Sequence, residues 1–211
     1  MNCISRIFVD YISFEREFSD VYRWLCEGTR ENNREKVSEA FDELMNLMTM
    51  ASMDIRDYDI AAKANYIVRI LNKFISGEAA LEITKRDLDD FQKLLVVTAN
   101  HERKQRSNRL VRELQALIDV VPIIAKQNRS DMRHECWLFA RRCGISKEFM
   151  EDKLGYRKFT SIDYLRVACD FVRNSTDDEL ATDIDVWLEI IVATYPCIRN
   201  TKFAEMVKKH K

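Results

Sequence analysis

Apolar residues recur along most of the chain at intervals of three and four, the spacing that places them on one face of an α-helix. The first half carries four such stripes, and the expected ends of the first and third are Gly28 and Gly77. Thr84 is the expected N-cap of the helix that carries the fourth stripe. The stripes cover residues 14–25, 37–51, 60–75 and 88–95. With short segments at 4–12 and 31–37, the first half is expected to form about six helices.

Six further helices are expected in the second half, because capping residues and helix-ending residues alternate with apolar stripes there. Pro122 is expected to kink or end the first of them. The expected N-terminal caps are Ser130, Ser146, Ser161, Thr176 and Thr201, and the expected ends are Gly144, Gly155 and Pro196. The pattern therefore predicts an all-α protein.

A polar stretch separates the two halves. Residues 98–108 (TANHERKQRSN) contain no large apolar side chain. The predicted division is a domain over 1–97, a polar segment over 98–107 and a second domain over 108–211. Arg, Lys, Glu and Gln favour helix, so the segment is either a linker or a solvated helix.

Composition narrows the class of protein. Gly and Pro number 4 and 2 in 211 residues, too few for the turns of a sheet protein. No apolar run reaches the ~18 residues of a membrane span, and the N-terminus lacks the order of a signal peptide. The six cysteines show no paired spacing, which favours a reducing compartment. These features predict a cytoplasmic protein that does not enter a membrane.

Charge and chemistry make binding more probable than catalysis. The net charge is -1, which argues against a generally basic nucleic-acid binder, although residues 101–142 are clearly basic. No nucleophile motif or glycine-rich phosphate loop is present. His134 and Cys136 would lie 200° apart on a helix and could not share a metal. We expect no enzymatic activity, no cofactor and no metal.

Residues 135–146, ECWLFARRCGIS, resemble the second and third helices of death domains, whose common form is W-x-x-L-A-R-x-L-G-hydrophobic-S. The family's tryptophan falls at Cys136, one place before Trp137. The matching positions are Phe139, Ala140, Arg141, Gly144, Ile145 and Ser146. The resemblance covers residues 111–210 and implies a six-helix death domain.

The first half has a fainter likeness to another family of the same fold. Residues 22–44 resemble the second to fourth helices of a death effector domain. KRDLDDF (85–91) resembles the family's R-x-D-L charge motif, with Lys85 in place of its arginine and Asp87 as its aspartate. Glu17 or Asp20 would be the acidic partner of that motif. The resemblance implies a second six-helix bundle.

Together the halves resemble the Fas-associated death-domain adaptors. The resemblance implies that the C-terminal domain binds a death-domain receptor or adaptor. It also implies that the N-terminal domain recruits an initiator caspase prodomain, in cell death or innate immunity, with possible self-association. The expected protein-binding residues are Trp24, Leu25, Lys85 and Asp87 in the first domain and Arg133, Arg141, Arg142 and Lys147 in the second. Trp24 is either a core residue or an exposed anchor of the interface.

Two other hypotheses stay open. Residues 136–155 also fit a DNA-binding helix-turn-helix, although the segment that would enter the major groove has a net negative charge. The chain could instead be a helical scaffold without either activity. The most basic run, Arg103, Lys104, Arg106, Arg109 and Arg112, is either a solvated helix face or a surface for an acidic partner or RNA.

Overall fold

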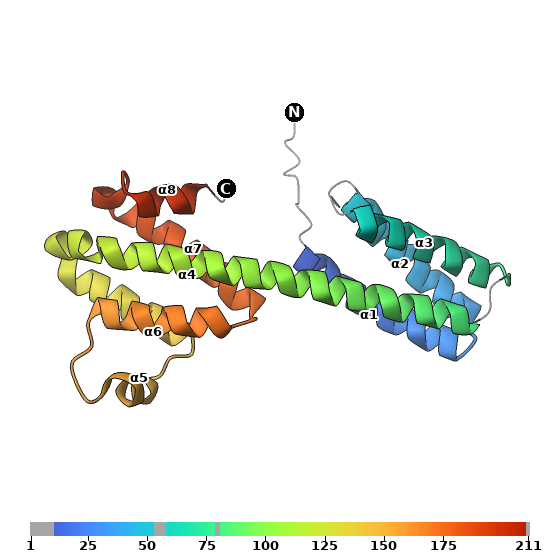
Figure 1. Cartoon of the computed structure of the whole chain (residues 1–211), viewed down its shortest axis with the longest axis horizontal. Helices are drawn as coiled ribbons and strands as arrows, with labels where there is room; N and C mark the ends of the chain where they lie inside the picture. The colour runs from blue at the N-terminus through green and yellow to red at the C-terminus, as the bar shows by residue number, and fades with distance from the viewer. Residues whose placement is uncertain (1–10, 53–57, 79–80, 210–211) are drawn as a thin grey trace. The chain divides into compact units, whose positions relative to one another are not determined.

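The all-α prediction is confirmed over the part of the chain that the structure describes. This computed structural model describes residues 11–52, 58–78 and 81–209, and every regular element in those ranges is helical (Figure 1). The chain forms two compact units, unit 1 (Met1–Glu102) and unit 2 (Arg103–Lys211). The division between them falls inside the polar segment 98–107, which is helical.

The elements in chain order are α1 (Tyr11–Arg30), α2 (Arg34–Ser52), α3 (Tyr58–Ile75), α4 (Leu81–Arg142), α5 (Lys147–Leu154), α6 (Ser161–Asn174), α7 (Asp178–Thr194), the 3-10 helix η1 (Pro196–Ile198) and α8 (Lys202–Lys208). Element α4 supplies helix to both units, up to Glu102 in unit 1 and from Arg103 in unit 2. Within the described ranges, no helix is both long and apolar enough to cross a bilayer.

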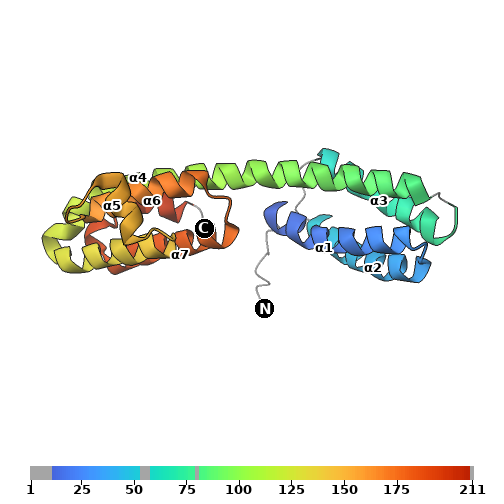
Figure 2. The same ribbon diagram turned by 90° about the horizontal axis from the view of Figure 1, so that it is seen from below.

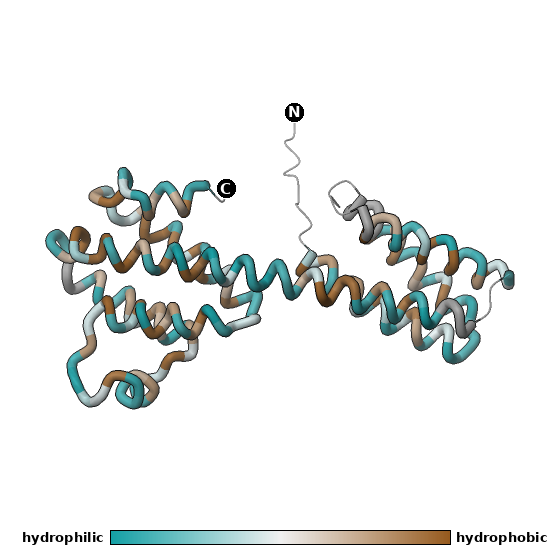
Figure 3. Tube along the Cα trace, viewed as in Figure 1, coloured by the Kyte–Doolittle hydropathy of each residue, from teal (hydrophilic) through white to brown (hydrophobic). Residues whose placement is uncertain are grey.

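Unit 1 packs α1, α2, α3 and the first part of α4 around one apolar core. Figures 1 and 2 show α1 and α2 side by side. The rings of Phe18 in α1 and Phe91 in α4 meet edge to face with their centroids 5.0 Å apart, and both side chains are fully buried. Apolar residues alternate with polar ones along each of these helices (Figure 3), as the stripes predict.

The predicted end of the first helix at Gly28 is wrong, because α1 continues to Arg30. Gly28 is buried, and a Cβ atom there would lie 2.8 Å from Cγ2 of Val37. The glycine therefore lets α2 approach α1 closely. The chain turns at Asn32, which has a φ of 51°, and α2 starts at Arg34. The separate helix predicted over 31–37 is thus a turn and the start of α2, and residues 4–10 lie outside the described ranges.

The structure confirms the predicted end of the third helix and corrects the start of the next. Gly77 has a φ of 86°, and its N–H donates to the carbonyl of Phe74 after the end of α3. This is the left-handed conformation that glycine adopts without strain. Element α4 begins at Leu81, so the predicted start at Thr84 is wrong. The leucine and glutamate at the start of this helix favour helix, and the helix extends to Leu81 rather than beginning at Thr84.

Unit 2 contains six α-helical segments in its described residues. Element α4 breaks at Asn128, whose φ of −151° and ψ of 66° are not helical, and the chain then reverses direction (Figure 1). Pro122, expected to kink or end this helix, lies inside it, and the non-helical residue is Asn128, close to the cap predicted at Ser130. The core joins all the segments, and Phe139 stacks on Trp187 with ring centroids 4.0 Å apart.

Side-chain caps start the helices of unit 2. The predictions for Ser146 and Thr201 are confirmed, because each hydroxyl accepts a backbone N–H in the first turn of its helix. Helix α6 is capped by Thr160 rather than Ser161, since Asp163 is placed to return the hydrogen bond. Helix α7 is capped by Asp177, one residue after the predicted Thr176. The side chain of Ser130 lies outside the described part of the chain.

Candidate functional site

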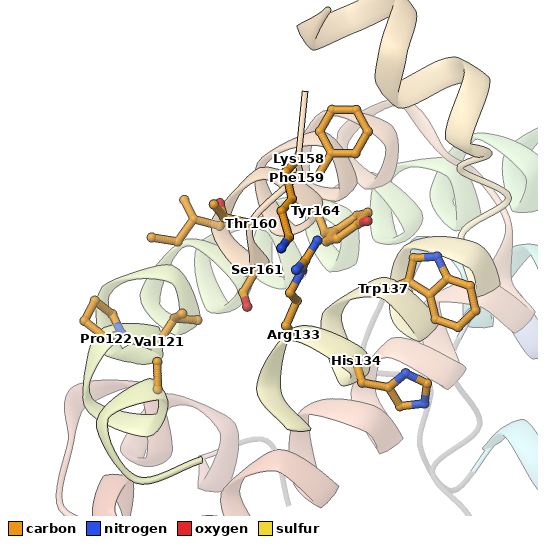
Figure 4. A pocket seen from close by; sticks show the side chains of 12 residues that line it. Val121, Pro122, Arg133, His134, Trp137, Lys158, Phe159, Thr160, Ser161 and Tyr164 are labelled. Atoms are coloured by element: carbon orange, nitrogen blue, oxygen red, sulfur yellow. The ribbon is translucent and has the colours of Figure 1, made fainter. Parts of the chain in front are cut away.

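Basic and aromatic side chains line a groove in unit 2, which we call the basic groove. It consists of a cavity of about 960 Å³ (Figure 4) and a second of about 550 Å³. The two cavities share part of their lining, so they form one depression. The shared lining residues are Arg133, Trp137, Lys158, Phe159 and Tyr164.

Two stretches of chain build the basic groove. After the break at Asn128, α4 carries Arg133, Trp137 and Arg141 at intervals of four, so these side chains lie on one face of the helix. The opposite wall comes from the segment before α6 and from its first turns. Thr160 and Asp163 fix that wall through their capping box, in which the Thr160 N–H donates to the Asp163 carboxylate over 2.8 Å.

An exposed aromatic surface lies beside these charges. Trp137 has 36% of its surface exposed, and the Arg141 guanidinium lies 5.4 Å from its ring centroid. The ring of His134 is 5.5 Å from the indole on the same helix. A tryptophan with an arginine over its ring can bind both apolar and anionic groups of a ligand.

Several cations of the basic groove already have partners within the chain. Arg157 donates to Asp163 over 2.7 Å, and Lys147 pairs with Glu151 at 3.2 Å. Burial opposes ionisation of Asp163, but hydrogen bonds from Thr160 and the charge of Arg157 outweigh it and lower the pKa of Asp163. Among the described residues, Arg133 has no ion pair.

The structure brings three of the four residues predicted for the second domain into this groove. Arg133 lines both cavities, and Arg141 and Lys147 line the smaller one. Arg142 is exposed but lines neither cavity. The sequence analysis did not identify Lys158 as a groove residue. The sequence RKFT at 157–160, two cations followed by an aromatic residue, was the available signal.

Trp137 was noticed only for its offset from the family pattern. Cys136 is fully buried in the core, while Trp137 lies about 100° further round the helix at the surface. The neighbouring tryptophan is free to contact a ligand.

Several arginines of the basic run at 103–112 form ion pairs within unit 2. Arg103 pairs with Asp178 at 3.0 Å, and Arg109 binds Asp185 through two hydrogen bonds of 2.8 and 2.9 Å. Arg106 also donates to Asp185. These pairs attach α4 to α7. The sequence contained a signal for these pairs. The arginines recur every three residues and the aspartates are seven apart, so each set lies on one face of its helix.

Arg109 also reaches a buried carboxylate. Its Nη1 lies 3.2 Å from Oε2 of Glu113, whose side chain is only 1% exposed. Burial alone would lower the pKa of Arg109, but its bonds to Asp185 and Glu113 outweigh burial and raise it. Arg109 is therefore the group that compensates a charge in the core of unit 2.

The residues predicted for the first domain do not form one surface. Trp24 is 50% exposed, which settles its position at the surface of α1. Leu25 is fully buried in the core of unit 1, so its assignment to a contact surface is corrected: an apolar residue in the core stripe cannot reach a partner.

The charge motif predicted in unit 1 is not assembled among the described residues. Lys85 is exposed and has no ion pair with Asp87 there, and Asp20 pairs with Arg23 instead. Asp87 is half-buried, with its Oδ2 atom buried and without a hydrogen bond. A shorter cation of different shape in place of arginine removes the two-pronged geometry that holds such a motif together.

Cys136, Cys143 and Cys169 in unit 2 are core residues. Burial raises the pKa of Cys136 and of Cys143 to about 12, and that of Cys169 to about 11. Thiols in this state are poor nucleophiles and poor metal ligands. In the described ranges, no group of three or more His, Cys, Asp or Glu side chains is placed to hold a metal.

Comparison with protein-family models, with curated proteins and with solved structures gave no match for this chain.

Proposed function

We propose that the chain is a non-enzymatic adaptor with a separate protein-binding surface on each unit. Unit 2 binds an acidic surface of an upstream partner through the basic groove, and unit 1 binds a downstream protein. The observation that carries the proposal is the clustering of Arg133, Arg141 and Trp137 on one face of α4, at the wall of an open groove.

The composition of the groove favours a protein partner. Arginine and tryptophan are among the residues most often found at the energetic centre of protein interfaces. The cations also supply steering toward an acidic partner. The lining of the smaller cavity contains one carboxylate, Glu148, so most of the groove is free of like-charge repulsion toward such a partner.

In finer detail, we propose that unit 2 is a death domain whose partner is the death domain of a receptor or of another adaptor. Its six helical segments follow the order that the resemblance implies, with the motif of residues 139–146 at the end of α4 and the start of α5. The charged groove lies next to that motif. Both observations support this form of the proposal.

For unit 1 we propose recruitment of an initiator caspase prodomain. The support is narrower, and it consists of the exposed indole of Trp24 on α1 together with the sequence likeness at 22–44. Only four helices, α1 to α3 and the start of α4, are seen in the described part of unit 1, so the six-helix form remains a sequence-based expectation.

A nucleic-acid-binding regulator is the second candidate, favoured by the helix–turn–helix shape of residues 136–155, with Gly144 in the turn at a φ of 76°. Helix α5 would then enter the major groove. Its exposed side chains include Glu148 and Asp152, which phosphates repel. Titration of duplex DNA at low salt tests this candidate, since a DNA-binding protein would bind there and lose affinity steeply as salt rises.

The experiment for the adaptor is affinity capture from cell lysate with the full-length chain as bait, followed by identification of the retained proteins. We expect a death-domain protein and an initiator caspase. Arg141→Glu should remove the first and keep the second, while Trp24→Ala should do the reverse. Circular dichroism establishes that each variant is folded. Retention of neither protein by the wild-type chain would overturn the proposal.

A further inference from the structure

The larger cavity of the basic groove brings two cations together without a carboxylate between them. Arg133 and Lys158 line both cavities and, within the described residues, neither forms an ion pair. Figure 4 shows both side chains extending into the cavity from opposite walls, with their charged ends toward one another. Two like charges held in one concave space repel, and a bound anion removes that repulsion.

The arrangement differs from the rest of the groove. Arg157 and Lys147 have carboxylate partners, and Arg141 lies over Trp137. Arg133 and Lys158 are the pair left available on the facing walls. The lining of the larger cavity contains neither aspartate nor glutamate, so nothing there would repel an anion.

We infer that this cavity is a binding site for a phosphomonoester group, held by Arg133 and Lys158. A phosphate monoester carries close to two negative charges at pH 7, which matches two cations, whereas a carboxylate would leave one cation uncompensated. The planar guanidinium of Arg133 can donate two parallel hydrogen bonds to phosphate oxygens, and the Lys158 ammonium acts as a point charge.

Neighbouring groups fit the same chemistry. Ser161 and Tyr164 line the cavity, and the Tyr164 hydroxyl can donate to a further phosphate oxygen, while the Ser161 side chain hydrogen-bonds to Cys136. Trp137 and His134 extend the site with ring surfaces on which the organic part of the ligand can rest. The site therefore fits a phosphate group attached to a larger molecule.

This inference rests on the proposed function only in treating the basic groove as the binding surface of unit 2. It does not require the partner to be a death domain. The phosphate group can come from a phosphorylated side chain of a partner protein or from a free phosphomonoester, and the experiment below separates these sources.

The test is a titration of the full-length chain, followed by NMR at the indole N–H of Trp137 and the Nε–H of Arg133. The probes are inorganic phosphate, acetate, a short peptide containing phosphoserine, and the same peptide with serine, all at constant ionic strength. We expect saturable shifts with phosphate and with the phosphoserine peptide. The serine peptide and acetate should produce none.

Variants assign the site to the two cations. Arg133→Gln and Lys158→Gln should each weaken phosphate binding about tenfold or more, the effect of losing about 1.4 kcal/mol. The matched control is Arg142→Gln, an exposed arginine on the same helix that lines neither cavity, and it should leave binding unchanged. Binding should also weaken as the pH falls through about 6, where the phosphate group gains a proton.

A tighter affinity for the phosphoserine peptide than for inorganic phosphate would assign the ligand to a partner's side chain, and equal affinities would assign it to a free phosphomonoester. Equal binding of acetate and phosphate, or equal loss in all three variants, would overturn the inference. Capture of a partner that depends on Arg141 while phosphate fails to bind would overturn the inference and leave the adaptor proposal standing.

Discussion

Replacing Arg109 by glutamine should destabilise unit 2 strongly, because this side chain compensates two carboxylates at once. Its guanidinium makes a two-pronged pair with Asp185 at 2.8 and 2.9 Å and lies 3.2 Å from Glu113. Glu113 is 1% exposed, while Asp185 is 29% exposed. The variant therefore removes a cation that lies 3.2 Å from the buried Glu113 carboxylate.

The magnitude follows from that difference in exposure. Breaking a fully buried ion pair by removing one member costs about 3–5 kcal/mol, and an exposed pair costs about 0–1 kcal/mol. Asp185 keeps a second cation, because Arg106 lies 3.0 Å from it. Breaking the Arg109–Asp185 pair therefore costs an amount near the lower of these two ranges. Most of the cost comes from Glu113. We expect a fall of about 2–4 kcal/mol in the free energy of unfolding of unit 2.

The assay is urea unfolding at pH 7 followed by tryptophan fluorescence in a Trp24→Phe background. The chain has 3 tryptophans, and this background leaves Trp137 and Trp187, both in unit 2, as reporters. The matched control is Arg112→Gln, on the same helix, where the exposed side chain bonds only to the carbonyl of Asn108 at 3.3 Å. It should change the free energy by less than about 0.5 kcal/mol.

A double variant tests the stated cause. Adding Glu113→Gln to Arg109→Gln removes the buried carboxylate that has lost this cation, so it should restore about 1–2 kcal/mol. If Arg109→Gln costs no more than Arg112→Gln, or if the second substitution adds to the loss, then Glu113 is not compensated by Arg109 and the reasoning fails.

Three further predictions concern other parts of the structure. Gly28→Ala should lower the stability of unit 1 by about 1–3 kcal/mol, because its Cβ would lie 2.8 Å from Val37 Cγ2; a thermal midpoint of unit 1 equal to that of the wild type would contradict this. Asp163→Asn should cost about 1–2 kcal/mol at pH 7. The pKa of Asp163 is lowered in the folded chain, so its stabilisation is present above about pH 4 and is lost as the pH falls through the folded value. The cost measured by urea unfolding should therefore shrink below pH 4, and a pH-independent cost would count against the assignment. Cys136, Cys143 and Cys169 should resist iodoacetamide at pH 8 in the native chain and react in urea, as burial raises the pKa of each thiol to about 11 or 12; mass spectrometry of labelled peptides checks this, and fast native labelling of any of the three would contradict their burial.

The helices and much of the core could be predicted from periodicity, because burial on one face dictates the spacing of apolar residues. Phe18, Leu25 and Trp187 were in predicted stripes, and all three are buried. The caps at Ser146 and Thr201 were predictable because the side chain acts on its own first turn.

Boundaries that depend on tertiary packing could not be predicted. The sequence predicts a helix end at Gly28, but the glycine lies inside α1 and allows α2 to pack closely against it. Pro122 reads as a break, yet the helix continues to Asn128. At Gly28 the local signal is weaker than the contact with Val37 of the next helix.

The candidate site was predictable only in part for the same reason. Arg133 and Arg141 could be named because they are basic residues in or beside the motif of residues 135–146. Lys158 enters the site from the segment before α6, and its place opposite Arg133 depends on how α6 packs. The ion pairs of the basic run at 103–112 were not predicted, because the acidic partners, Asp178 and Asp185, lie some 75 residues further along the chain.

The central claim is that the basic groove binds an acidic partner. It is tested most directly by comparing Arg141→Glu with Arg142→Glu in quantitative capture of the proposed death-domain partner by the full-length chain. The two substitutions make the same charge change on adjacent exposed residues, and only Arg141 lines the groove. The account predicts that Arg141→Glu abolishes capture while Arg142→Glu retains most of it. Equal capture by the two variants, whether high or low, would contradict it.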